Sequence, residues 1–246
     1  MCGGRCAPTS TYPAISGEPV TTFVLVHGSW HGPWCWERLI PELDRCGHRA
    51  ATPQLPSADP AASFADYADV VAAAVDDDDT VLVGHSLAGY LLPLVAQRRA
   101  VRHQVYLAAL VAEPGLSFAE QQRRDGMLNP AYRGALRPVD GGTEWVDRDL
   151  ARELLFSDCD EPTVAAAFGR LSGQANHPLR QPAADAEPPA VPTTYLVCTE
   201  DRMLDPFWSR RAAERRLGVR AVELAGGHSP FYSRPEALAA VLVGLI

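Results

Sequence analysis

Short apolar runs alternate along the chain with longer amphipathic segments. The apolar runs are rich in β-branched residues, which is typical of strands buried on both faces. These predicted strands cover residues 21–27, 49–52, 80–83, 104–109, 193–198 and 220–224. Segments with apolar residues at helical spacing lie between them and cover 39–47, 61–75, 87–99, 206–217 and 235–246. This alternation predicts the α/β class, with a mostly parallel central sheet and helices on both of its faces.

The alternation breaks down between residues 110 and 189. Predicted helical pieces there are separated by loops that contain Gly and Pro, and they cover 117–124, 149–156 and 162–171. An insertion between two strands of a sheet is a candidate lid over a pocket. We therefore expect a helical cap insertion at 111–189 on a core formed by 20–110 and 190–246. Residues 1–19 lack any periodicity, so we expect a flexible N-terminal arm.

Composition narrows the class of protein. A chain of 246 residues is long enough for one domain with a substantial core. The net charge of −8 argues against nucleic acid or an anionic membrane as the main partner. The six cysteines lack zinc-ligand spacing and are interpreted as free thiols. The sequence contains neither an apolar run of membrane-spanning length nor a hydrophobic signal region. We expect a cytoplasmic protein that acts on a small molecule, with its oligomeric state left open.

The stretch Thr80–Tyr90, TVLVGHSLAGY, joins a predicted strand to a predicted helix through a sharp turn. A serine at such a turn has its hydroxyl lifted out of the sheet, as in the nucleophile elbow Gly-x-Ser-x-Gly. Here Ala88 takes the place of the last glycine and Gly89 follows one position later. Alanine is a mild departure because that position needs a small residue. The stretch predicts Ser86 as a nucleophile.

A serine hydroxyl needs a base beside it and a third group that orients the base. Catalytic groups of open α/β sheets gather at the carboxyl ends of the strands. His228 follows the last predicted strand in a glycine-rich loop, and Asp201 follows the strand before it, so we predict them as base and acid. Asp205 is expected to cap the helix that begins at Pro206. Glu113, which also follows a strand, is the alternative acid.

Acyl transfer also needs two backbone N–H groups that point at the developing oxyanion. Leu87, directly after the nucleophile, is predicted to supply one, and Ser29, in the loop after the first strand, the other. The neighbouring His27 and His85 are expected to support the backbone, and His31 to lie behind the site.

Aromatic residues near these motifs suggest an apolar pocket, although most aromatic side chains are simply buried in cores. Trp30 follows the oxyanion loop and Phe118 opens the cap, so we predict both as pocket residues. His177 in the cap is a further candidate for contact with substrate. The remaining candidates are Trp34, Trp36, Phe168, Phe231 and Tyr232.

Four motifs together resemble the α/β-hydrolase superfamily. They are HGSWHGPWCW at 27–36, GHSLAG at 84–89, CTED at 198–201 and GHSP at 227–230. The chain is most similar to the branch that holds plant methyl-ester esterases, hydroxynitrile lyases and small bacterial carboxylesterases. The likeness covers nearly everything from Thr21 onward, with the cap the least family-like part. It implies a triad of Ser86, Asp201 and His228, no cofactor or metal, and a pocket between core and cap.

The resemblance also separates two reactions. Hydroxynitrile lyases of this branch have a threonine where this chain has Gly28 and a lysine after the catalytic histidine, where this chain has Ser229. The sequence therefore favours a cofactor-independent serine hydrolase that cleaves a carboxylic ester, lactone or thioester of a small, largely apolar substrate. The alternatives are acyl transfer, C–C bond cleavage or cyclisation of a biosynthetic intermediate on the same fold, and a non-catalytic small-molecule binding protein.

Overall fold

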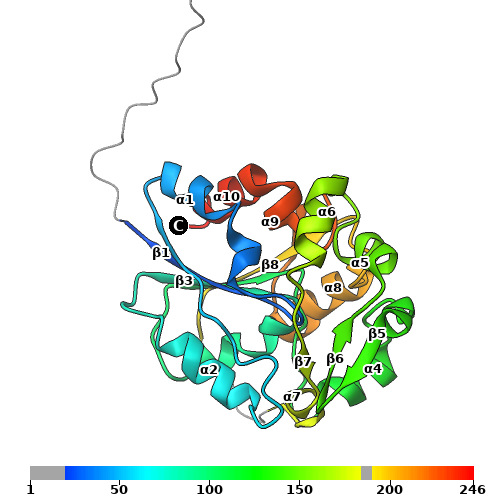
Figure 1. The fold of residues 1–246 in the computed structure, drawn as a ribbon. Coiled ribbons are helices and arrows are strands. Elements are labelled where there is room, and N and C mark those ends of the chain that lie inside the picture. Colours follow the sequence, from blue (N-terminus) through cyan, green and yellow to red (C-terminus); the bar gives the residue numbers. More distant parts are fainter. Residues whose placement is uncertain (1–19, 184–189) are drawn as a thin grey trace, which may run out of the picture.

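A six-stranded sheet runs through the centre of the molecule, as Figure 1 shows for the computed structural model. The structure describes residues 20–183 and 190–246, so the predicted arm at 1–19 lies outside the described residues. The strands follow the order β2-β1-β3-β4-β8-β9, and all neighbours pair in parallel. Their bounds are Thr22–Val26 for β1, Arg49–Ala51 for β2, Thr80–His85 for β3, His103–Leu107 for β4, Thr193–Cys198 for β8 and Val222–Leu224 for β9.

Burial of the central strands explains their unbroken apolar sequences. All six residues of β3 are buried, and so are the last four residues of β1 and of β4. A parallel sheet with both faces covered needs apolar side chains on both sides of each strand. The predicted fold class is confirmed in the sheet, and each predicted strand lies within a few residues of an observed one.

Helices cover both faces of this sheet. Helices α1 and α10 lie on one face and α2 on the other (Figure 1). The bounds are Ile40–Arg45 for α1, Phe64–Ala72 for α2, Leu92–Ala96 for α3, Pro206–Ala212 for α8, Pro230–Ser233 for α9 and Pro235–Val243 for α10. The helix predicted at 87–99 starts instead as a 3-10 turn, Ser86–Tyr90, and the one predicted at 206–217 ends in a π-helical turn, Ala213–Leu217. Among the described residues, no helix is long and apolar enough to cross a membrane.

The insertion between β4 and β8 contains helices and a second small sheet. Its predicted helices are present as α4 (Phe118–Asp125), α5 (Arg148–Leu155) and α6 (Glu161–Phe168), with η3 (Pro130–Ala135) and α7 (His177–Arg180) in addition. The insertion also contains a small sheet that the sequence did not indicate. An antiparallel sheet, β5-β6-β7, joins Leu136–Val139, Gly142–Trp145 and Gln174–Ala175. These strands are too short, and β5 too exposed, to produce an alternating pattern in the sequence.

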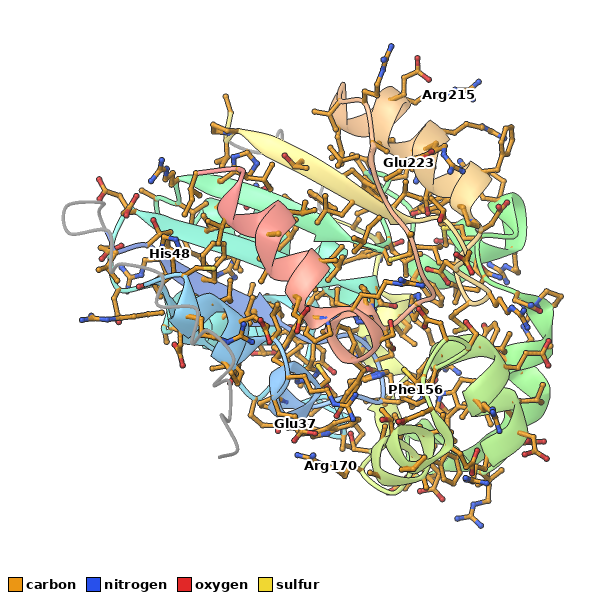
Figure 2. All side chains as sticks on the ribbon, turned by 90° about the horizontal axis from the view of Figure 1, so that it is seen from above. Glu37, His48, Phe156, Arg170, Arg215 and Glu223 are labelled. Carbon is orange, nitrogen blue, oxygen red and sulfur yellow. The ribbon has the colours of Figure 1, made fainter. Side chains whose placement is uncertain are left out.

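Ion pairs and hydrogen bonds join the insertion to the core on the side where the chain leaves β1. Arg170, just after α6, pairs with Glu37 at 2.6 Å, and Arg38 donates to Thr163 Oγ1 at 2.7 Å. Figure 2 shows Glu37 and Arg170 beside each other there, with Arg215 and Glu223 on the far side of the molecule. The insertion is thus held against the edge of the sheet where the strands end.

Candidate active site

Ser86 occupies the sharp turn at the end of β3 with a backbone φ of 53°, in the left-handed region. Tight packing around the turn explains the local sequence. A Cβ on Gly28 would lie 2.8 Å from the Cβ of Ser86, and one on Gly89 would lie 2.0 Å from the carbonyl oxygen of Leu110. The closest backbone approach therefore falls at Gly89 and not one position earlier, which is why Ala88 is tolerated there.

The three residues predicted as nucleophile, base and acid lie in contact. Ser86 Oγ is 3.2 Å from His228 Nε2, and His228 Nδ1 is 2.7 Å from Asp201 Oδ2. The other carboxylate oxygen, Asp201 Oδ1, accepts backbone N–H groups of Met203 and Leu204 at 2.9 Å each. The side chains of His228 and Asp201 are each 2% exposed. This is the arrangement by which a serine is activated for attack on a carbonyl group.

The two residues predicted to supply oxyanion donors, Ser29 and Leu87, line the cavity that contains Ser86. Leu87 is the second residue of a 3-10 helix, so its N–H has no partner within that helix. Ser29 lies in the loop after β1, and within residues 20–183 and 190–246 its N–H makes no hydrogen bond. The geometry therefore leaves both predicted donors available to a bound oxyanion.

Three further histidines bind the backbone around these groups. His27 Nδ1 donates to the Gly28 carbonyl at 3.0 Å, and His31 Nδ1 donates to the Ser29 carbonyl at 2.9 Å. His85 Nε2 donates to the carbonyl oxygen of His228 at 2.9 Å.

Burial keeps these three histidines neutral. It lowers the pKa of His27 to about 4 and that of His31 to about 3, and it holds the pKa of His85 well below its usual value. At neutral pH they are therefore uncharged and support the backbone of Gly28, Ser29 and His228.

A cavity of about 420 Å³ opens above Ser86, between the sheet and the insertion. Trp30 and Phe118, the two predicted pocket residues, line it. Part of its wall comes from apolar residues that no sequence motif indicated, such as Leu128, Tyr132, Leu136, Leu179 and Met203. These residues lie in loops or in the short elements η3, β5 and α7, where neither periodicity nor spacing provides a signal.

The other aromatic candidates do not line this cavity. They are Trp34, Trp36, Phe168, Phe231 and Tyr232. Trp36 and Phe231, both fully buried, pack on each other with ring centroids 4.8 Å apart, which makes them core residues. His177 is also absent from the lining, and its ring hydrogen bonds to Gln181 at 3.0 Å.

The two other acidic candidates have structural partners. The Glu113 carboxylate accepts from Arg124 at 2.5 Å and from Arg216 at 2.7 Å, away from His228. Asp205 accepts the N–H of Phe207 at 2.9 Å, so its predicted role as the N-cap of α8 is confirmed. Asp201 is the acid that contacts the base.

One acidic residue near the site was missed in the sequence. Asp158, between α5 and α6, accepts the N–H of Gly227 at 3.1 Å through Oδ2, directly before the base His228. A Cβ on Gly226, whose φ is 128°, would lie 2.8 Å from the same carboxylate oxygen. The insertion therefore holds the turn that carries the base. The contact joins residues 69 positions apart, and no local motif indicates it.

Comparisons with known proteins identify the family and the fold of the chain. A family model described as "Alpha/beta hydrolase family" matches residues 23–241. The chain is 36% identical over 260 residues to a "Carbendazim hydrolyzing esterase" of Nocardioides sp. (strain SG-4G), covering 92% of this chain and 100% of that protein. It is 29% identical over 252 residues to "Probable esterase PIR7A" of Oryza sativa subsp. japonica, covering 90% and 95%. The solved structure of polyneuridine aldehyde esterase is similar in fold, with a TM-score of 0.78 at 19% identity over 92% of this chain and 99% of that one.

Proposed function

The chain belongs to the alpha/beta hydrolase family, as its motifs predicted, and we propose that it cleaves carboxylic esters with Ser86 as the nucleophile. It is an enzyme of the carboxylic ester hydrolase class, because relatives that match nearly its whole length are named esterases. The observation that carries the serine mechanism is the continuous contact from Ser86 Oγ through the His228 ring to Asp201, at 3.2 and 2.7 Å.

The proposed reaction follows from these contacts. His228 Nε2 takes the hydroxyl proton as Ser86 Oγ attacks the ester carbonyl, and Asp201 stabilises the imidazolium ion that forms. The N–H groups of Ser29 and Leu87 hold the oxyanion, and each donor of this kind contributes roughly 10²–10³ in rate. The alcohol then leaves with the proton from His228. Water repeats the sequence on the acyl-enzyme and regenerates the serine.

The residue after the base supports hydrolysis over cyanohydrin cleavage. Ser229 is fully buried and carries no charge, whereas a lyase of the resembling branch has a lysine there to hold the cyanide ion. His27, His31 and His85 are kept neutral by burial, so they supply no cation in its place. The groups around Ser86 therefore suit a neutral leaving alcohol.

The cavity supports a small substrate with an apolar body. Its volume of about 420 Å³ and its lining by Trp30, Leu87 and Phe118 suit an acyl or aromatic group next to the scissile bond.

The test is hydrolysis of p-nitrophenyl esters of increasing acyl length by the wild type and by Ser86→Ala. Wild-type turnover that the variant lacks, together with unchanged thermal unfolding, is the expected result. A fluorophosphonate probe should label the wild type and not the variant. Equal turnover by the two proteins would exclude Ser86 as the nucleophile.

A further inference from the structure

The mouth of the catalytic cavity is lined by arginines. Arg123 from α4, Arg133 from η3 and Arg180 from α7 lie on the same cavity as Ser86. We propose that they bind a carboxylate, so that the substrate is an ester with a second, ionised carboxyl group remote from the scissile bond. This inference rests on the proposed function and specifies its substrate class.

None of the three arginines forms an ion pair in the part of the chain that the structure describes, although the hydrogen bonds from Ser117 and then the charge of Arg123 lower the pKa of Glu120 on the same helix. All three are exposed, and within residues 20–183 and 190–246 none makes a hydrogen bond or an ion pair. The guanidinium carbon of Arg133 lies 5.9 Å from the ring centroid of Tyr132, another residue of the same cavity. The donors of these side chains are thus available to a ligand.

The neighbouring arginine on the same helix behaves differently. Arg124 faces away from the cavity and is hydrogen bonded to the carboxylates of Glu113 and Asp125. The acid one turn before Arg123 is Glu120, whose carboxylate accepts the N–H and hydroxyl of Ser117. On helix α4, Arg124 is therefore ion-paired outside the cavity, whereas Arg123 has no ion pair and lines the cavity.

The sign of the charge in the cavity is opposite to that of the whole chain. Acidic residues outnumber basic ones, 30 to 22, and all 22 basic residues are arginines. Nevertheless, no Asp or Glu lines the cavity among residues 20–183 and 190–246. At physiological salt, charges more than about 8 Å away are largely screened, so the local arginines set the potential at the mouth.

Guanidinium groups match this ligand well. Their planar donors bind both oxygens of a carboxylate at once, which a compact ammonium group cannot do. Apolar residues, among them Phe118, Leu128 and Leu179, line the same cavity as the arginines and the serine. A matching substrate has an ester at one end, an apolar spacer, and a carboxylate at the other end, as in a monoester of a dicarboxylic acid.

Two matched pairs of esters test the inference. In the first pair the charge is on the acyl side, with mono-p-nitrophenyl adipate against p-nitrophenyl hexanoate. In the second it is on the alcohol side, with 3-(4-acetoxyphenyl)propanoate against its primary amide. We expect kcat/KM, normalised to spontaneous hydrolysis, to favour the anion by about tenfold in at least one pair at low salt. That preference should shrink in 0.5 M NaCl.

Arginine variants separate the cavity from the general surface. Arg123→Gln and Arg133→Gln should each reduce the anion preference, by up to about fivefold, the upper range for an exposed ion pair. The triple variant that adds Arg180→Gln should remove the preference, because kcat/KM falls more for the anionic ester of each pair than for its neutral partner. Arg220→Gln is the matched control, because Arg220 is exposed and lies just before β9, at the opposite end of the sheet from Ser86.

Binding to Ser86→Ala provides a readout that needs no turnover. The variant is titrated calorimetrically with monomethyl adipate, an anion, and its neutral partner dimethyl adipate, and then with the alcohol-side pair. In at least one pair the anion should bind more tightly than its neutral partner. If no anion binds or reacts better than its neutral partner, the inference is overturned, and Ser86-dependent hydrolysis of the neutral esters would still support the proposed function. If the anion binds better but Ser86 is not needed for hydrolysis, the anion site stands and the serine mechanism fails.

Discussion

Replacing Asp201 by asparagine tests the triad most sharply, because the structure fixes which way the new amide would face. The Oδ1 atom of Asp201 accepts two backbone N–H groups, from Met203 and Leu204, at 2.9 Å each. An asparagine would keep its carbonyl oxygen at that position, since its NH₂ group cannot accept those hydrogens. The NH₂ group would then face His228 Nδ1, which is 2.7 Å from the present carboxylate oxygen.

The ring of His228 would respond by changing tautomer. With a donor opposite Nδ1, the ring must carry its hydrogen on Nε2, the atom 3.2 Å from Ser86 Oγ. Such a ring cannot accept the hydroxyl proton, and no carboxylate stabilises its protonated form. The same change in serine-protease triads lowers kcat by about 10⁴, which corresponds to roughly 5.5 kcal/mol of transition-state stabilisation.

The assay is kcat for a p-nitrophenyl ester, measured beside thermal unfolding of the same protein. Glu113→Gln is the matched control, because Glu113 was the alternative acid and its carboxylate is bound by Arg124 and Arg216 instead. We expect Glu113→Gln to keep kcat within about threefold. If Asp201→Asn retained more than a tenth of the wild-type kcat with an unchanged fold, Asp201 would not be the residue that orients the base.

Three further outcomes follow from the packing and burial of the site. Gly89→Ala should lower the free energy of unfolding by about 2–3 kcal/mol in urea denaturation, because the new Cβ would lie 2.0 Å from a backbone carbonyl oxygen. The control Gly134→Ala, whose Cβ would have nothing within 4 Å, should change that free energy by less than about 1 kcal/mol, and equal effects of the two substitutions would contradict the close approach at Gly89. Burial lowers the pKa of His27 to about 4 and that of His31 to about 3, so below the unfolded value of 6.5 the unfolded chain binds more protons than the folded one. The free energy of unfolding should therefore fall as the pH drops from 6.5 towards 4, by roughly 1.4 kcal/mol per pH unit for each histidine, and a His31→Gln variant that kept the wild-type slope would refute this. Asp158→Ala should lower kcat several-fold with little change in KM, because the turn before the base loses its acceptor, and an effect confined to unfolding temperature would show a purely structural role.

The candidate catalytic residues that lie at the end of a strand, or closely after one, could be predicted from the sequence. Ser86 lies in a strand–turn–helix stretch, and Asp201 and His228 each follow a strand closely. The carboxyl ends of parallel strands meet at one edge of a sheet, so three local observations are enough to bring these side chains together.

Residues whose proposed roles depend on contacts between segments far apart in the sequence could not be predicted from it. Asp158 and the turn at Gly227 are separated by 69 positions, and Arg123, Arg133 and Arg180 come together only when three short cap elements fold over the sheet. Strands β5, β6 and β7 have two to four residues and lie outside the regular alternation of strands and helices that indicated the equally short β2 and β9. Hydrophobic pattern therefore predicted the core, but it did not predict the small sheet of the insertion.

The insertion does more than enclose a substrate, because it also holds backbone that the chemistry uses. Trp30, directly after the proposed oxyanion donor Ser29, has a left-handed φ of 61°. Its ring nitrogen donates to Thr143 Oγ1 on β6 at 3.2 Å, and its carbonyl accepts the N–H of Ser172 at 2.8 Å. Asp158 holds the turn of the base in the same way. An exchange of the whole insertion for that of a relative should therefore lower kcat even for a small neutral ester, whereas substitutions confined to the three cavity arginines should mainly change the choice of substrate.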